Sequence, residues 1–233
     1  MHTIQRSFNT WNYAHCTLKD DLFSILHHAK SCGYTHVELS YDNLKKLDFE
    51  RKTLNKLKNI LPISSLHVRA DNLMNPNLPS TCDLLETQDI ILPMWMPSLG
   101  SVFAPLDVPS MYHSYLIVRR MDIFRMQSIK DTSKWVDDIQ KIASAMHKKG
   151  LRLSFHNHLH EWIPFDGRHS MMDLLCKRTN PNELFFQLDI GHALLANVDL
   201  PTFIKKHKNR IVSFHLKDFR ILRDQSRQII NEE

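Results

Sequence analysis

The chain has 233 residues, enough for a substantial core in one large domain or two small ones, and its 42% hydrophobic and 24% charged residues are the ordinary balance of a soluble protein. Its net charge of +5 and pI of about 9.0 suit an anionic ligand such as a sugar phosphate or a nucleic acid. Neither a secretory signal nor an apolar run of the ~18 residues that cross a bilayer is visible, so no membrane partner is expected. The four cysteines form no C-x-x-C pair, which indicates a reducing cytoplasm and argues against a disulfide framework or a cysteine zinc site.

Strands and helices are predicted to alternate along the chain, because short strand-like segments are followed by segments with a helical period. The expected strands lie within residues 7–15, 36–40, 64–69, 89–94, 151–162, 184–192 and 211–219. The expected helices cover residues 18–31, 44–61, 133–149, 170–178 and 200–206. This alternation, without repeats or a low-complexity linker, favours an α/β protein with a β/α barrel over an open doubly wound sheet.

Two stretches depart from a complete barrel. Residues 96–132 lose the pattern and are predicted to be a loop with a helix around residues 112–126, which either closes over the mouth of the barrel or forms a plain surface excursion. Residues 220–233 are too few for an eighth strand and its helix. The chain is therefore expected to be truncated, or the barrel to be incomplete with its edges covered by other means.

The last three expected strands each carry polar side chains on one face. These side chains are Ser154, His156 and His158, then Gln187 and Asp189, and finally Ser213, His215 and Lys217. A parallel strand buried on both faces is normally apolar, so such groups must be hydrogen-bonded or must hold a metal. Because the C-terminal ends of barrel strands meet at one mouth, we expect His156, Asp189 and His215 to converge there. The alternative is an ordinary core in which neighbouring side chains satisfy the histidines.

Four motifs in this order and at these intervals carry a family resemblance: GYTHVELS (33–40), HNHLHEW (156–162), LDIGHAL (188–194) and RIVSFHLKDF (210–219). Together they resemble the xylose isomerase-like TIM-barrel family, which includes sugar-phosphate isomerases and epimerases, inosose dehydratases and, more distantly, DNA-repair enzymes of the endonuclease IV type. The resemblance implies that residues 1–233 form one TIM-type barrel domain that is short at its C-terminus and lacks the eighth β/α unit.

The resemblance also implies a divalent metal held by a Glu, an Asp, a His and a Glu on strands five to eight. Asp189 and His215 match two of these ligands, and His156 occupies the carboxylate position of strand five. The strand-eight Glu has no counterpart in this chain. Two imidazoles and one carboxylate would hold Mn, Co, Fe or Zn better than Mg, which prefers oxygen ligands.

Proton transfer next to a carbonyl needs a base and an acid. With the two family Glu residues absent, the candidates in falling order are Glu161, Lys217 and Glu38. Lys217 could equally clamp a phosphate or pair with Asp218. Polar residues at the ends of the strands are expected to contact the substrate, namely His158, His192, His67 and Arg69.

The favoured function is a metal-dependent isomerase or epimerase that acts on a small polyol, sugar or sugar phosphate through an enediolate. An inosose dehydratase-like lyase shares that intermediate and stays open. So does a catalytically degenerate, truncated barrel. An endonuclease IV-like enzyme is disfavoured, because the basic residues are scattered and further ligands of a metal cluster are missing, so nucleic acid is not the expected partner. Assembly into a homo-oligomer stays open.

Overall fold

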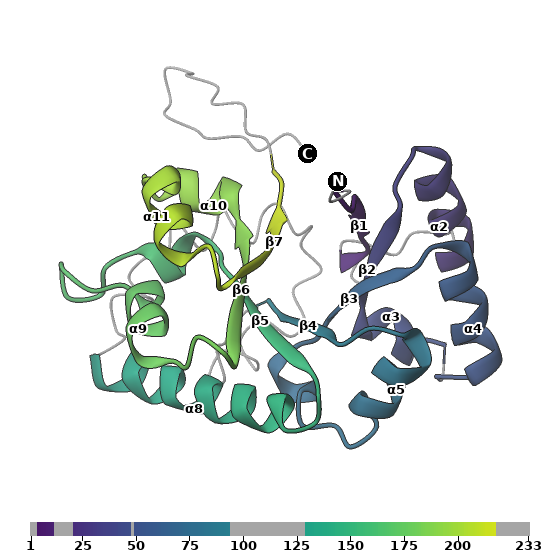
Figure 1. The fold of residues 1–233 in the computed structure, drawn as a ribbon, viewed down its shortest axis with the longest axis horizontal. Coiled ribbons are helices and arrows are strands. Elements are labelled where there is room, and N and C mark those ends of the chain that lie inside the picture. Colours follow the sequence, from purple (N-terminus) through teal and green to yellow (C-terminus); the bar gives the residue numbers. More distant parts are fainter. Residues whose placement is uncertain (1–3, 12–20, 48, 94–128, 218–233) are drawn as a thin grey trace. The chain divides into compact units, whose positions relative to one another are not determined.

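A computed structural model describes residues 4–11, 21–47, 49–93 and 129–217 of the chain (Figure 1). The strands are β1 (Ser7–Asn9), β2 (His36–Ser40), β3 (Ile63–His67), β4 (Asp89–Leu92), β5 (Arg152–His156), β6 (Leu184–Asp189) and β7 (Ile211–His215). The helices are α2 (Leu22–Ser31), α3 (Tyr41–Lys45), α4 (Arg51–Ile60), α5 (Leu78–Leu85), α8 (Ile129–His147), α9 (Met171–Arg178), α10 (Ile190–Leu195) and α11 (Leu200–His207). Two short 3-10 helices, η1 (Ala70–Asn72) and η2 (Leu159–Trp162), follow β3 and β5.

The strands follow one another through one sheet in the order of the chain, from β1 to β7. The pairs β1·β2, β2·β3, β3·β4 and β6·β7 are parallel. Parallel neighbours need a crossover connection, and helices supply most of the crossovers among the described residues. The predicted α/β class with a TIM-type order of strands is therefore confirmed.

The described residues within 1–97, together with residues 142–153, form one compact unit. Its core is aliphatic and includes Leu39, Leu57 and Leu66, each fully buried. In this unit α2 packs against α4, and α4 packs against α5. The start of β5 is held here, because the Arg152 guanidinium donates to both carboxylate oxygens of Asp89 on β4.

The described residues within 98–141 and 154–233, namely 129–141 and 154–217, form a second compact unit, which includes β6 and β7. The register of these two strands places Gln187 beside Ser213 and Asp189 beside His215. Phe186 and Leu188 on β6 are buried in the core of this unit. Both strands thus reach their C-terminal ends at the same level, with Asp189 and His215 side by side.

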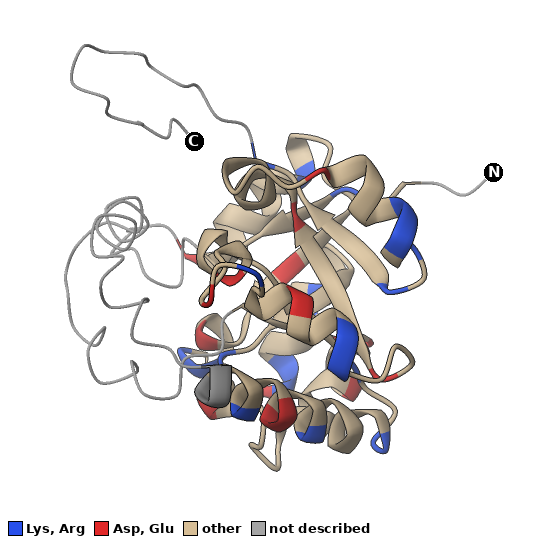
Figure 2. Ribbon diagram, turned by 90° about the vertical axis from the view of Figure 1, so that its left-hand side faces the viewer, with Lys and Arg blue, Asp and Glu red and all other residues tan. Residues whose placement is uncertain are grey.

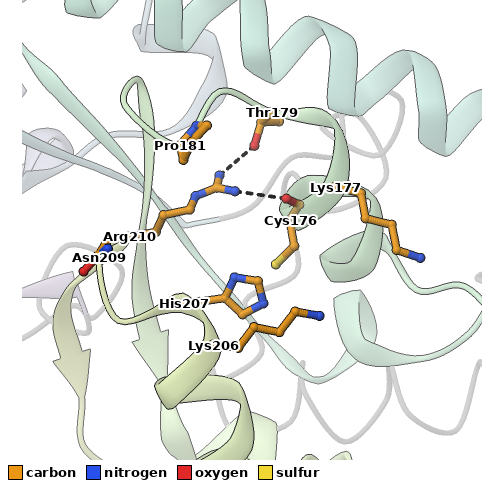
Figure 3. A pocket seen from close by; sticks show the side chains of 8 residues that line it. All are labelled: Cys176, Lys177, Thr179, Pro181, Lys206, His207, Asn209 and Arg210. Atoms are coloured by element: carbon orange, nitrogen blue, oxygen red, sulfur yellow. Dashed lines mark hydrogen bonds between the residues drawn. The ribbon is translucent and has the colours of Figure 1, made fainter.

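Arg210 lies at the N-terminal ends of β6 and β7, away from Asp189 and His215 (Figure 3). Its guanidinium donates to three oxygens, at 3.1 Å to Leu184 O, 3.2 Å to Cys176 O and 2.6 Å to Thr179 Oγ1. The pocket beside it is lined by Cys176, Lys177, Thr179, Pro181, Lys206, His207, Asn209 and Arg210. Because α9 and α11 both end at this pocket, its cations offset the partial negative charge of the helix C-termini.

Basic and acidic residues are interleaved along α8, the long helix at the bottom of Figure 2. On α8, Lys134 and Lys141 both pair with Asp138, and Asp137 pairs with Arg178 on α9. These ion pairs offset the positive charge along α8 and at the end of α9. In the part of the chain that the structure describes, no helix is long and apolar enough to cross a membrane.

The structure corrects several predicted boundaries. The helix expected over residues 44–61 is wrong; the chain forms α3 and α4 instead, and Phe49 between them has a φ of +52°, which a helix cannot accommodate. The strand expected within residues 151–162 ends at His156, so His158 lies beyond it. The strand expected over residues 184–192 ends at Asp189, whose side chain accepts from His192 N and thereby begins α10. Helix α5 was not predicted.

Other boundaries agree more closely with the sequence prediction. Residues 36–40 form β2 as expected, and residues 170–178 are found as α9 with Ser170 as its N-cap. The helix predicted around residues 112–126 and the stretch from residue 218 onward lie outside the described residues.

Candidate metal centre

Three side chains meet where β5, β6 and β7 end. His156, Asp189 and His215 are the last residues of these strands, and the carboxyl ends of parallel strands lie at one edge of a sheet. Asp189 Oδ2 lies 3.6 Å from His156 Nε2 and 3.3 Å from His215 Nδ1. One donor atom from each residue lies within 4.8 Å of the other two, so all three can reach one ion.

Burial of the three side chains is graded. The side chains of Asp189 and His156 are 0% and 2% exposed, whereas that of His215 is 28% exposed. An ion and its remaining ligands would therefore approach from the side of His215.

Asp189 is held by its neighbours in a way that leaves one carboxylate oxygen available. Asp189 Oδ1 accepts from His192 N at 2.9 Å. The backbone of Asp189 is fixed by Asn157, whose side chain accepts from Asp189 N at 2.9 Å and donates to Asp189 O at 3.1 Å. Oδ2 is buried and faces His156 Nε2 at 3.6 Å, His215 Nδ1 at 3.3 Å and the Lys217 ammonium at 3.3 Å. A buried carboxylate needs cationic or hydrogen-donating partners, and a metal ion between Asp189 and the two imidazoles would be such a partner beside Lys217.

The protonation states suit a metal ligand set. Burial and the neighbouring His215 ring lower the pKa of His156 to about 3. Burial raises the pKa of Asp189, but His215, Lys217 and His192 outweigh it and hold that pKa below its ordinary value. Near neutral pH the site thus presents a neutral imidazole and a carboxylate, the forms that bind metals. Two imidazoles and one carboxylate fit a borderline transition metal better than Mg.

Lys217 lies between two of the predicted site residues. Its Nζ is 3.3 Å from Asp189 Oδ2 and 3.3 Å from His192 Nε2. Burial and the Lys217 charge lower the pKa of His192 to about 4, so this imidazole is neutral and its Nε2 can accept a hydrogen bond from the ammonium. Asp218, the alternative partner of Lys217, lies outside the described residues.

Glu161 is buried and engaged locally. Its Oε2 accepts from His158 N at 2.7 Å, and its Oε1 lies 2.8 Å from His160 Nε2. The His158 ring lies 4.8 Å from the His156 ring and 5.0 Å from the His192 ring, measured between centroids. His158, His192 and Lys217 thus surround the three candidate ligands.

The remaining predicted residues belong to the first unit. Glu38 and His67 are both buried and lie together, with 3.5 Å between Glu38 Oε1 and His67 Nδ1. Asn9 and Ser65 each donate to the Glu38 carboxylate at 2.7 Å. Arg69 is not drawn into this group; its side chain is 46% exposed and lies 3.6 Å from Asp71.

Comparisons with known proteins identify the fold of the chain and relatives that match part of its sequence. No protein-family model matches the chain. Inosose dehydratase of Geobacillus thermodenitrificans is 26% identical over 102 residues, which is 42% of this chain and 33% of the relative. The chain thus spans about a third of the length of the curated relatives that it matches first.

Solved structures match over most of the chain. A sugar phosphate isomerase/epimerase from Parabacteroides distasonis superposes with a TM-score of 0.66 at 17% identity, over 95% of this chain and 81% of that one. A fusion protein of a xylose isomerase-like TIM barrel with 4-hydroxyphenylpyruvate dioxygenase gives a TM-score of 0.62 at 18% identity, over 96% of this chain and 33% of that one. This chain has the xylose isomerase-like TIM-barrel fold.

Two further residues contact the candidate ligands, although the sequence analysis gave them no role. Gln187 Oε1 lies 2.8 Å from His156 Nδ1, and Asn157 holds the Asp189 backbone. Gln187 was placed on the correct polar face of β6, and a buried amide there was the available signal. Asn157 was placed on the opposite face, but β5 ends at His156 and the alternation does not continue to it.

Proposed function

We propose that this chain is a metal-dependent isomerase or epimerase acting on a sugar or sugar phosphate through an enediolate. The carrying observation is that the buried Asp189 Oδ2 lies 3.6 Å from His156 Nε2 and 3.3 Å from His215 Nδ1, so that all three residues can reach one ion. Relatives named inosose dehydratase and a neighbour named sugar phosphate isomerase/epimerase support this class of substrate.

We assign His156, Asp189 and His215 as the residues that would hold the metal. When bound, Mn, Co, Fe or Zn would polarise a substrate carbonyl and stabilise the negative charge that forms when the adjacent carbon loses its proton. The three residues leave further coordination positions open for substrate oxygens. A neutral polyol or a sugar phosphate meets the mildly basic chain without electrostatic penalty.

Lys217 is our candidate for returning the proton. Its ammonium lies 3.3 Å from both Asp189 and His192, so it can return a proton to the carbon of a substrate held beside Asp189. We keep Glu161 as the candidate base, with His158 and His192 as hydrogen-bonding partners of substrate hydroxyls. In the first unit Glu38 is the remaining proton-transfer candidate, and His67 and Arg69 are the remaining candidates for contacting substrate.

A second candidate, an inosose dehydratase-like lyase, is favoured by the identity to inosose dehydratases over 102 residues. Both reactions begin with loss of the proton beside a carbonyl, and they differ in the next step. The lyase expels a hydroxyl as water, whereas the isomerase or epimerase returns a proton to carbon.

One experiment separates these outcomes. Cobalt- or manganese-loaded protein is incubated in D₂O with a panel of ketoses, their phosphates and keto-inositols, and the products are followed by NMR. We expect deuterium to enter the carbon beside the carbonyl of a sugar substrate, with a new isomer or epimer. Loss of water from a keto-inositol would favour the lyase instead. No exchange with any substrate would contradict both and support a barrel without activity.

A further inference from the structure

His156, at the end of β5, can bind a metal only if its ring is held in the correct tautomer. A carboxylate in the same position has no such requirement. Either oxygen of a carboxylate can bind a metal, but a neutral imidazole binds only through the nitrogen that carries no hydrogen. His156 must therefore be held in one of its two tautomers if Nε2 is to serve as a ligand.

The contact with Gln187 decides which tautomer forms. The oxygen of an amide accepts hydrogen bonds and cannot donate them. Because Gln187 Oε1 lies 2.8 Å from His156 Nδ1, the hydrogen sits on Nδ1 and Nε2 keeps its lone pair. That lone pair lies on the side of Asp189 Oδ2, 3.6 Å away, so two acceptors face each other across a gap that suits a cation.

Gln187 is well placed to hold this arrangement. It is 4% exposed on β6, and its backbone is paired with Ser213 of β7. Gln187 stands two residues before Asp189, so one strand supplies both the candidate ligand and the partner of the neighbouring ligand. An amide also supplies an acceptor without adding a negative charge to a buried site.

We propose that Gln187 is a positioning residue that fixes His156 as the Nδ1–H tautomer and so presents Nε2 toward Asp189. This inference rests on the proposed metal site and deepens it. It assigns to a residue of this chain the role that carboxylates or carbonyls play behind metal-bound histidines, where their loss typically weakens metal affinity about 10- to 100-fold.

The test uses the full chain and three variants. Gln187→Leu removes the acceptor at similar volume, Gln187→Glu keeps an acceptor oxygen, and Gln88→Leu is the matched control at an exposed position. The tautomer of His156 is read in the metal-free protein from its imidazole ¹⁵N shifts. The affinity for Zn and Co is read by competition with a chromophoric chelator.

We expect the Nδ1–H tautomer in the wild type, Gln88→Leu and Gln187→Glu, and a mixture or the Nε2–H tautomer in Gln187→Leu. We expect the metal dissociation constant of Gln187→Leu to rise about 10- to 100-fold, and that of Gln187→Glu to stay at or below the wild-type value. A wild-type tautomer and affinity in Gln187→Leu would overturn the inference.

Two further outcomes are informative. If Gln187→Leu does not fold, an Nε2–H tautomer in the wild type or in Gln187→Glu would overturn the inference by itself. If the wild type binds no metal, the proposed site fails, while the tautomer still decides the role of Gln187.

Discussion

Asn157 and Asp189 are joined by two hydrogen bonds, one in each direction, between the side chain of the first and the backbone of the second. The amide of Asn157 thus takes the place of a strand neighbour at the point where β6 passes into α10. Because Asp189 supplies the oxygen that would bind an ion, the position of that oxygen depends on a residue outside the candidate ligand set.

Asn157→Ala is expected to lower the free energy of unfolding by about 1–3 kcal/mol, because it leaves buried backbone groups of Asp189 without partners. Urea unfolding of the metal-free protein measures this change. Asn182→Ala, at an exposed turn, is the matched control and should differ little from the wild type. Equal stabilities of the two variants would contradict the role given to Asn157.

The metal-free protein should lose stability as the pH falls from about 7 to about 5. Burial lowers the pKa of His156 to about 3 and of His192 to about 4, and it lowers the pKa of His158 as well. Below the ordinary histidine pKa of ~6.5, the unfolded chain takes up protons that the folded chain refuses, so the free energy of unfolding decreases by up to ~1.4 kcal/mol per pH unit for each such histidine.

Urea unfolding at several pH values, with a chelator present, measures this dependence. His158→Gln removes one of the three histidines and should reduce the slope. A free energy of unfolding that is the same at pH ~7 and pH ~5 would show that these imidazoles are not held neutral by the fold.

Lys217→Met should raise the pKa of His192 from about 4, because the Lys217 charge is one of its depressing causes after burial. It should also raise the pKa of Asp189, which the same charge helps to lower. Titration of the His192 ring by NMR checks the first change. Lys217→Arg keeps the charge and should leave the pKa of His192 near its wild-type value. A pKa of His192 in Lys217→Met equal to that of the wild type would show that Lys217 does not act on this imidazole.

Arg210→Met should destabilise the second unit by about 2–4 kcal/mol, since it removes three hydrogen bonds that a charged group donates, one to the start of β6 and two to the end of α9. The other end of β6 carries Asp189, so metal affinity should change far less than stability. Thermal unfolding measures the change in stability, and a metal titration of the same sample measures the change in metal affinity. Arg178→Gln, a surface ion-pair partner, is the control; a loss of stability equal to that of Arg210→Met would contradict the special role of Arg210.

The sequence predicted the parallel strands well because their polar and apolar faces are distinct. The alternation placed His156 and Gln187 on one face, and the structure brings them into contact. It also predicted that His156, Asp189 and His215 would converge, and their donor atoms do lie within shared reach of one point. Their role as ligands stays a prediction.

The ends of the strands were harder to predict, because capping contacts between distant residues decide them. The pattern LDIGH continues the apolar alternation past Asp189, but the Asp189 side chain accepts from His192 N and begins a helix there. Asn157 follows β5, and its side chain donates to the backbone oxygen of Asp189, 32 positions further along the chain. Neither contact has a local periodic signal in the sequence.

The most direct measurement of the central claim is the metal content of the purified chain after loading with Co or Zn and dialysis. We predict one ion per chain in the wild type and in Asp137→Asn, the surface control, and loss of that ion in Asp189→Ala and His215→Ala, with folding checked by circular dichroism. An unchanged metal content in folded Asp189→Ala would contradict the assignment of His156, Asp189 and His215 as the metal site.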